Sequence, residues 1–178
     1  MTCETAPHYL LLCDDDLREE GRFKMNPPLR DREDRQALLE GLADGTIDMI
    51  ATDHAPHAAE EKSKGLKGSA MGIVGLETAF PLLYTHLVRE QKLITLEKLV
   101  SLMAVAPRAR FGLPGGMLVP GAEADITLYD LDSAWDIDPE RFLSMGRATP
   151  FAGWHVYGEC AETICQGDTA WRRTGGEA

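Results

Sequence analysis

A short run of chemistry-bearing residues, Asp-His-Ala-Pro-His at 53–57, directly follows an apolar stretch at 47–52. Carboxylates and neutral imidazoles are the ligands of catalytic metal sites, in which one position stays open for water. We expect 47–52 to form a buried parallel strand, and α/β barrels carry their active-site groups at the carboxyl ends of such strands. Asp53 and His57 are therefore candidates for a metal-dependent site, although a surface turn in which Asp53 caps a helix fits the same pattern.

A second polar group, Glu-Thr-Ala-Pro-His-Tyr at 4–9, also lies beside an apolar run. A lone histidine near a core strand is more often structural than a ligand, but two strand ends that each offer a metal-ligand type favour a shared site. We therefore expect His8 and Asp53 to converge on one point. Asn26 precedes two prolines that fix the shape of its loop. Its amide can donate and accept hydrogen bonds to a ligand, or it can serve as a turn residue.

The secondary-structure elements that must position these groups are mixed helices and strands in the first part of the chain and mostly short strands in the last part. Residues 3–13 are expected to form a strand, or a strand and a loop, and the helix expected at 31–43 has Asp31 as its N-cap and a stop at Gly45. The other expected elements are helices at 75–89 and 96–103, a helical turn at 107–112, and short antiparallel strands at 125–129, 154–157, 161–165 and 169–171. We therefore predict an α/β region at 1–112, a β-rich segment at 113–172 and a disordered tail at 173–178.

Composition and charge exclude several classes of protein. The 178 residues include 18 basic and 29 acidic side chains, and a net charge of −11 disfavours binding to nucleic acid. The apolar run at 9–13 is as long as any in the chain and far below the roughly 20 residues that span a bilayer. No secretory signal is recognisable, and the four cysteines form no CxxC pair, so we expect a reduced, cytoplasmic protein with no membrane partner.

Several segments resemble dihydroorotases of the amidohydrolase superfamily, and they occur in that family's order. They are ETAPHYLLL at 4–12, NPPLR at 26–30, ATDHAPH at 51–57, GIVGLET at 72–78, ADI at 124–126 and TPF at 149–151. The resemblance runs from about residue 3 to residue 171. Allantoinases and hydantoinases share the scaffold. However, Asn26 before Pro-Pro and His57 after Asp-His-Ala-Pro resemble the residues that dihydroorotases have at these positions.

This resemblance implies a (β/α)8 TIM barrel followed by a small β-sandwich. Residues 1–112 would supply the last three βα units of the barrel, and residues 113–172 would supply part of the sandwich. The implied activity is the zinc-dependent, reversible hydrolysis of L-dihydroorotate to N-carbamoyl-L-aspartate in pyrimidine (UMP) biosynthesis. One or two zinc ions are implied.

The resemblance also assigns roles to individual residues. His8 is implied to be a zinc ligand, and Asp53 is implied to bind zinc and to move the proton of the attacking water. Asn26 and His57 would contact the carboxylate and ring of the substrate. The backbone at Met71 and Gly72 would add amide contacts, although Met71 stands where an aromatic residue is expected.

The sequence departs from the family in one large respect, because it contains no His-x-His pair. We therefore expect it to be the C-terminal portion of an enzyme whose other ligands lie in a missing N-terminal half, and to be inactive by itself. Association with a second copy or with aspartate transcarbamoylase is also implied as possible. Two alternatives stay open: a non-catalytic scaffold for aspartate transcarbamoylase, and another cyclic amidase such as an allantoinase.

Overall fold

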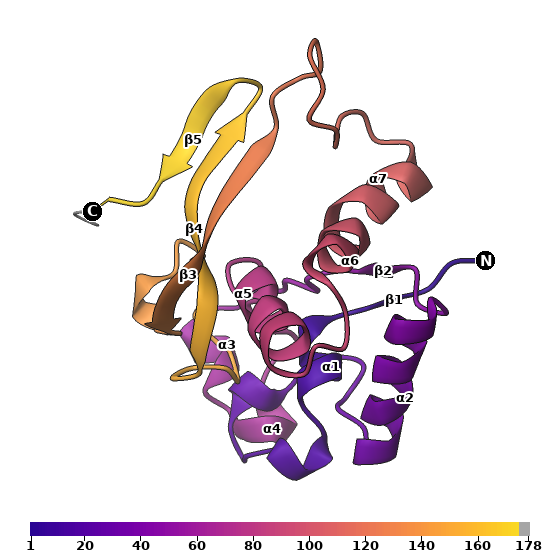
Figure 1. Ribbon diagram of the computed structural model, residues 1–178. Coiled ribbons are helices and arrows are strands. Elements are labelled where there is room, and N and C mark those ends of the chain that lie inside the picture. The colour runs from indigo at the N-terminus through magenta and orange to yellow at the C-terminus, as the bar shows by residue number, and fades with distance from the viewer. Residues whose placement is uncertain (175–178) are drawn as a thin grey trace.

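A computed structural model describes residues 1–174, which form a helical part and a separate three-stranded sheet (Figure 1). No helix in this described range is long and apolar enough to cross a membrane. The helical part contains α1 (Pro7–Leu11), α2 (Arg32–Asp44), α3 (Ala59–Lys62), α4 (Gly65–Gly68), α5 (Ala79–Leu83), α6 (Leu96–Val100) and α7 (Ala106–Phe111). Single 3-10 turns occupy Asp14–Asp16, Gly21–Phe23 and Pro139–Arg141, and π-helical segments at Tyr84–Glu90 and Ser101–Val105 continue α5 and α6.

Two short strands, β1 (Glu4–Thr5) and β2 (Met49–Ile50), pair in parallel within the helical part. An isolated parallel bridge joins His54 to Ile73. We expected three βα units here, and the described residues instead contain two paired strands and this bridge. The chain between β1 and β2 forms no strand. It contains Pro27 and Pro28, which have no backbone N–H to donate to a neighbouring strand.

The first predicted strand is shorter than expected. The backbone leaves β1 after Thr5, and α1 begins at Pro7, where proline favours the first turn of a helix. His8 therefore lies in a helix rather than on a strand. The predicted boundaries of the next helix are confirmed, because Asp31 accepts a hydrogen bond from the Asp34 amide at 2.9 Å and Gly45 adopts φ +88° at the end of α2.

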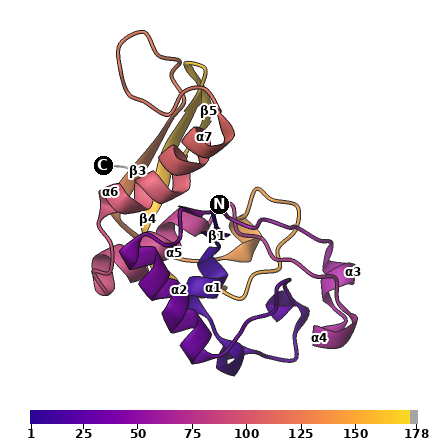
Figure 2. The same cartoon turned by 90° about the vertical axis from the view of Figure 1, so that its right-hand side faces the viewer.

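The sheet has the order β3 (Ile126–Asp136), β4 (His155–Cys165), β5 (Asp168–Arg172), and both pairings are antiparallel. Two strands that we expected separately, 154–157 and 161–165, are one continuous strand, β4. Figure 2 shows the sheet beside the helical part, with a long loop before β3. The sheet packs on the helices through two apolar clusters. In the first, Tyr157 of the sheet packs against a cluster that contains Phe80, Tyr84 and Leu87. In the second, Val156 of the sheet lies with Ile137, Phe142, Leu12 and Leu82.

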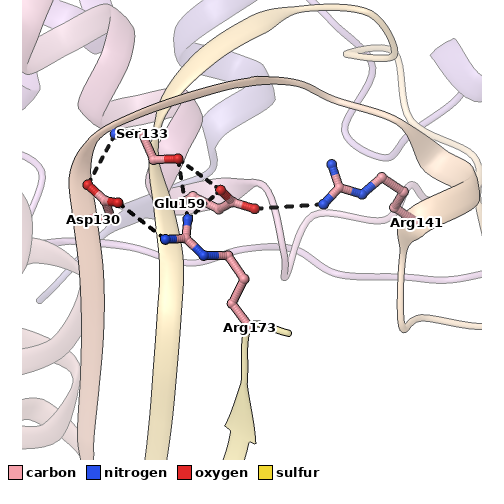
Figure 3. Close-up of polar contacts among 5 residues, drawn as sticks. All are labelled: Asp130, Ser133, Arg141, Glu159 and Arg173. Atoms are coloured by element: carbon pink, nitrogen blue, oxygen red, sulfur yellow. Dashed lines mark hydrogen bonds and ion pairs between the residues drawn. The ribbon is translucent and has the colours of Figure 1, made fainter. Parts of the chain in front are cut away.

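A network of charged side chains ties the end of β5 to the other two strands (Figure 3). Arg173 contacts Glu159 of β4 at 2.5 Å and Asp130 of β3 at 3.2 Å. We expected a disordered tail at 173–178, and this prediction is wrong for Arg173 because its guanidinium has two carboxylate partners. Residues 175–178 lie outside the described residues.

Candidate functional site

His8 and Asp53 lie together at the carboxyl ends of the two parallel strands. Asp53 comes three residues after β2, and His8 comes three residues after β1. Since neighbouring parallel strands end at the same edge of a sheet, both side chains reach one place. The His8 Nε2 atom lies 3.4 Å from Asp53 Oδ2, so the expected convergence of the two side chains is confirmed. Their roles as metal ligands stay a prediction.

The two side chains differ sharply in environment. His8 is 1% exposed, whereas Asp53 is 46% exposed. Burial lowers the pKa of His8 to about 4, although the Asp53 charge acts in the opposite direction. The imidazole is therefore neutral at neutral pH, which is the form that binds metal ions. Its buried Nε2 has no hydrogen-bond partner within residues 1–174.

The turn that carries Asp53 is held by the next residue. Asp53 has φ +50°, in the left-handed region that few residues other than glycine adopt. The His54 Nδ1 atom accepts hydrogen bonds from the amides of Gly75 and Leu76 at 3.1 and 3.2 Å. Because Nδ1 accepts twice, the neutral His54 ring carries its proton on Nε2. His54 thus braces the Asp53 turn against the segment before α5.

His57, Met71 and Gly72 form a second group beside this turn. The His57 Nε2 atom lies 2.8 Å from the Met71 carbonyl oxygen, and Nδ1 lies 3.6 Å from the Glu61 carboxylate. Gly72 has φ +128°, and a Cβ there would lie 2.6 Å from the Cβ of Ala55. Only glycine fits this position without displacing the loop. The structure therefore brings three of the predicted substrate contacts together.

Asn26 is exposed, and backbone carbonyls on either side of it accept hydrogen bonds from Gly72 and from Tyr9, which is next to His8. Lys24, two residues earlier, accepts a hydrogen bond from the Gly72 amide at 3.0 Å. Pro27, the next residue, accepts a hydrogen bond from the Tyr9 hydroxyl at 2.9 Å. The Asn26 loop is therefore held between the segment at 72 and α1.

Sequence reasoning missed two residues that support this arrangement. The Tyr9 ring packs on the His8 ring with centroids 4.0 Å apart, and burial, with the Asp53 charge, raises the pKa of Tyr9 to about 12. Its position next to His8 was a usable signal. Lys62 is buried under the loop that contains Met71. It gave no signal, because Glu-Glu-Lys at 60–62 has the composition of a solvated helix face.

The residues present fit half of a metal site. His8 supplies an unused buried nitrogen and Asp53 a half-exposed carboxylate 3.4 Å away, whereas a catalytic metal takes three protein ligands or more. The remaining histidines are engaged elsewhere, with His86 paired to Glu90 and His155 paired to Asp136.

A separate group of potential ligands follows α1. Cys13, Asp14 and Asp15 bring ligand-type atoms within 4.8 Å of one another. However, Asp14 and Asp15 are exposed, and Asp15 pairs with Arg32 at 2.7 Å. This group contains none of the predicted site residues.

Comparison with known proteins matches most of the chain to one family. The amidohydrolase family profile matches residues 14–170. Curated relatives named dihydroorotase include those of Geobacillus sp. (strain WCH70), 55% identical, and Bacillus cereus (strain AH820), 54% identical, both over 174 residues. Each match covers 97% of this chain and 40% of the relative, so the chain spans about two-fifths of the length of these curated relatives.

Solved structures of hydantoinases share this fold. L-Hydantoinase (dihydropyrimidinase) from Arthrobacter aurescens superimposes with a TM-score of 0.86 at 32% identity, over 99% of this chain and 40% of that one. D-Hydantoinase (dihydropyrimidinase) from Thermus sp. superimposes with the same TM-score at 28% identity, over 99% of this chain and 41% of that one.

Proposed function

Because the chain belongs to the amidohydrolase family, we propose that it is part of a dihydroorotase, in which it carries one side of the metal site and the substrate-binding loops. The observation that carries this proposal is the contact between His8 and Asp53, with a neutral buried nitrogen aimed at a half-exposed carboxylate. The choice of dihydroorotate as substrate rests on relatives of that name at 55% and 54% identity.

Within this proposal, the two parts of the chain have different roles. Residues 1–112 are one side of a (β/α)8 barrel, and the parallel pair of β1 and β2 supports this assignment. Residues 113–172 are one portion of a β-sandwich, and the three-stranded antiparallel sheet supports it. The rest of the barrel and sandwich would come from the three-fifths of the relatives' length that this chain does not span. The cytoplasmic location and an association with a second copy or with aspartate transcarbamoylase stay predictions.

The proposed metal is zinc, one or two ions, held on this side by His8 and Asp53. Members of the amidohydrolase family are generally metal-dependent, and the orphaned Nε2 of His8 fits a metal ligand. When bound, zinc supplies a Lewis acid that polarises the scissile carbonyl and makes the attacking water more acidic. The other ligands would come from outside this chain.

The chain's own residues divide the remaining work. Asp53 takes the proton of the attacking water and returns it to the ring nitrogen that leaves, since its half-exposed carboxylate can reach a ligand. His8 stays neutral, which leaves its unbonded Nε2 atom able to bind the metal. Asn26, His57 and the backbone at Met71 and Gly72 orient the substrate's carboxylate and ring, because the 24–27 and 70–72 loops lie against each other.

The proposal can be tested by segment exchange. The 174-residue segment of the Geobacillus dihydroorotase that matches this chain is replaced by this chain, and the purified hybrid is assayed with L-dihydroorotate and with N-carbamoyl-L-aspartate. We expect turnover in both directions, loss of turnover on removal of metal by a chelator, and recovery with zinc. The chain alone should show no turnover, because it holds only part of the ligand set.

Two controls make the result decisive. The hybrid is also assayed with hydantoin, dihydrouracil and allantoin, because the solved structures that superimpose on this chain are hydantoinases. Turnover of one of these rings in place of dihydroorotate would replace the proposed substrate. A folded hybrid that binds zinc but turns over none of the rings would contradict the enzyme assignment and favour the non-catalytic scaffold.

A further inference from the structure

A buried lysine joins the loops that surround the predicted substrate contacts. Lys62 is 7% exposed, and its Nζ atom donates hydrogen bonds to three backbone carbonyl oxygens. The acceptors are Lys24 at 3.0 Å, Ala70 at 2.8 Å and Gly72 at 2.6 Å. These carbonyls come from two segments that are far apart in sequence, and α3 supplies the lysine.

The three acceptors favour the charged form of this lysine, although burial and the charge of Lys24 lower its pKa. A neutral amine has two N–H groups, whereas an ammonium has three, and three acceptors surround Nζ. No carboxylate within residues 1–174 forms an ion pair with it at 4.0 Å or less. Backbone dipoles alone therefore hold this charge. Burial of a lysine without a carboxylate partner is uncommon, because it is costly in free energy.

The bonds of Lys62 fix the orientation of successive peptide groups. The carbonyls of Ala70 and Gly72 turn toward Nζ, and the Met71 carbonyl between them accepts from His57 at 2.8 Å. The Lys24 carbonyl accepts from both Lys62 and the Gly72 amide. Lys62 thus determines how the 70–72 loop faces the segment that leads to Asn26.

We propose that Lys62 is a positioning residue for substrate binding, and this inference rests on the proposed function. Its ammonium holds the Met71 and Gly72 backbone and the Asn26 loop at the spacing that the carboxylate and ring of the substrate require. It does not touch the reacting atoms. Its loss therefore weakens substrate binding and leaves the chemical step nearly unchanged.

The experiment uses the hybrid enzyme of the segment exchange with three substitutions at one position. Lys62→Met removes all three donors, Lys62→Gln keeps a donor group, and Lys62→Arg keeps both the charge and the donors. We expect KM for dihydroorotate to rise about tenfold in Lys62→Met, less in Lys62→Gln and least in Lys62→Arg, with kcat within about twofold throughout. The matched control is Lys64→Met, an exposed lysine two residues further along the chain, which should leave both constants unchanged.

A second measurement does not depend on activity. Amide hydrogen exchange of the chain itself is followed at Gly72, whose N–H donates to the Lys24 carbonyl at 3.0 Å. We expect exchange at Gly72 to be at least about tenfold faster in Lys62→Met and unchanged in Lys64→Met. If the Met variant does not fold, the Gln variant is measured in both assays.

The outcomes separate this inference from the proposed function. A parent hybrid with no turnover of dihydroorotate would refute the proposed function, and Gly72 exchange would then decide the role of Lys62 alone. Unchanged Gly72 exchange, an unchanged KM in a folded Met or Gln variant, or a fall in kcat at constant KM would each overturn the positioning role.

Discussion

The His57 ring donates from Nε2 to the carbonyl oxygen of Met71 at 2.8 Å, because a carbonyl can only accept. Two residues that the family resemblance implies to contact the same substrate are therefore bonded to each other. The other ring nitrogen, Nδ1, faces Glu61 at 3.6 Å. In the proposed enzyme, a substrate contact through Nε2 would require this bond to open, and the bond holds Met71 in the 70–72 loop.

His57→Ala is expected to weaken substrate binding. The substitution removes the hydrogen bond that anchors Met71, so KM of the hybrid enzyme for dihydroorotate should rise about tenfold while its zinc content stays constant. Steady-state kinetics and metal analysis check this. His155→Ala, at an exposed histidine of the sheet, is the control. An unchanged KM with lost zinc would make His57 a metal ligand instead.

Asp53→Asn is expected to abolish turnover and to preserve the fold. An amide cannot take the proton of the attacking water, and general acid–base catalysis contributes about 10²–10⁴ in rate, so kcat should fall at least about a hundredfold. The side chain is 46% exposed, so the melting temperature should change little. The Asp53 charge raises the pKa of His8, so that pKa should fall further in the variant. A kcat near that of the parent would contradict the role of Asp53.

The stability of the metal-free chain should depend on pH through His8. Above pH 6.5 the imidazole is neutral in both the folded and the unfolded chain, so it has no effect. Between pH 6.5 and about 4 the unfolded chain binds a proton that the folded chain does not, so stability falls as pH falls, by about 3 kcal/mol in total. Below about pH 4 the loss levels off. Urea unfolding at a series of pH values measures this slope.

The control for this pH dependence is a variant without an ionisable group at position 8. His8→Gln should be less stable at pH 7 and should have a flatter slope between pH 6.5 and 4. His155→Gln, at an exposed site, should keep the parent slope. A parent-like slope in His8→Gln would show that another group is responsible.

Local patterns predicted the parts of the fold that depend on nearby residues. The Asp31 cap and the Gly45 stop of α2 are such features, because the side chain and the amide that it binds are three residues apart. The length of the strand expected at 3–13 was overestimated, because the structure there depends on packing against residues distant in sequence. Its apolar residues also suit a helix, and Leu10 is buried in α1 against residues far along the chain.

The site was predictable only where residue type determines chemistry. His8 and Asp53 could be paired because imidazole and carboxylate are ligand types at strand ends, and their side chains do meet. Lys62 could not be found in this way. Its role depends on carbonyl oxygens of Lys24, Ala70 and Gly72, and backbone acceptors have no signature in a sequence.

The contact between Glu77 and the loop after Pro139–Arg141 should control the opening of that loop. The Glu77 carboxylate accepts hydrogen bonds from the Leu143 amide at 2.9 Å, the Ser144 amide at 3.0 Å and the Ser144 hydroxyl at 2.8 Å. Glu77→Ala removes all three acceptor contacts. It should lower the free energy of unfolding by about 1–3 kcal/mol and speed trypsin cleavage after Arg141 several-fold.

Limited proteolysis followed by mass spectrometry measures this opening. Glu77→Gln retains one carbonyl oxygen as an acceptor, so its cleavage rate should lie between those of the parent and Glu77→Ala. Glu60→Ala, an exposed acid of α3, is the matched control and should behave as the parent. If Glu77→Ala and Glu60→Ala are cleaved at equal rates, the three hydrogen bonds do not hold the loop. The packing of Phe142 in the core beneath it would then be the stronger constraint.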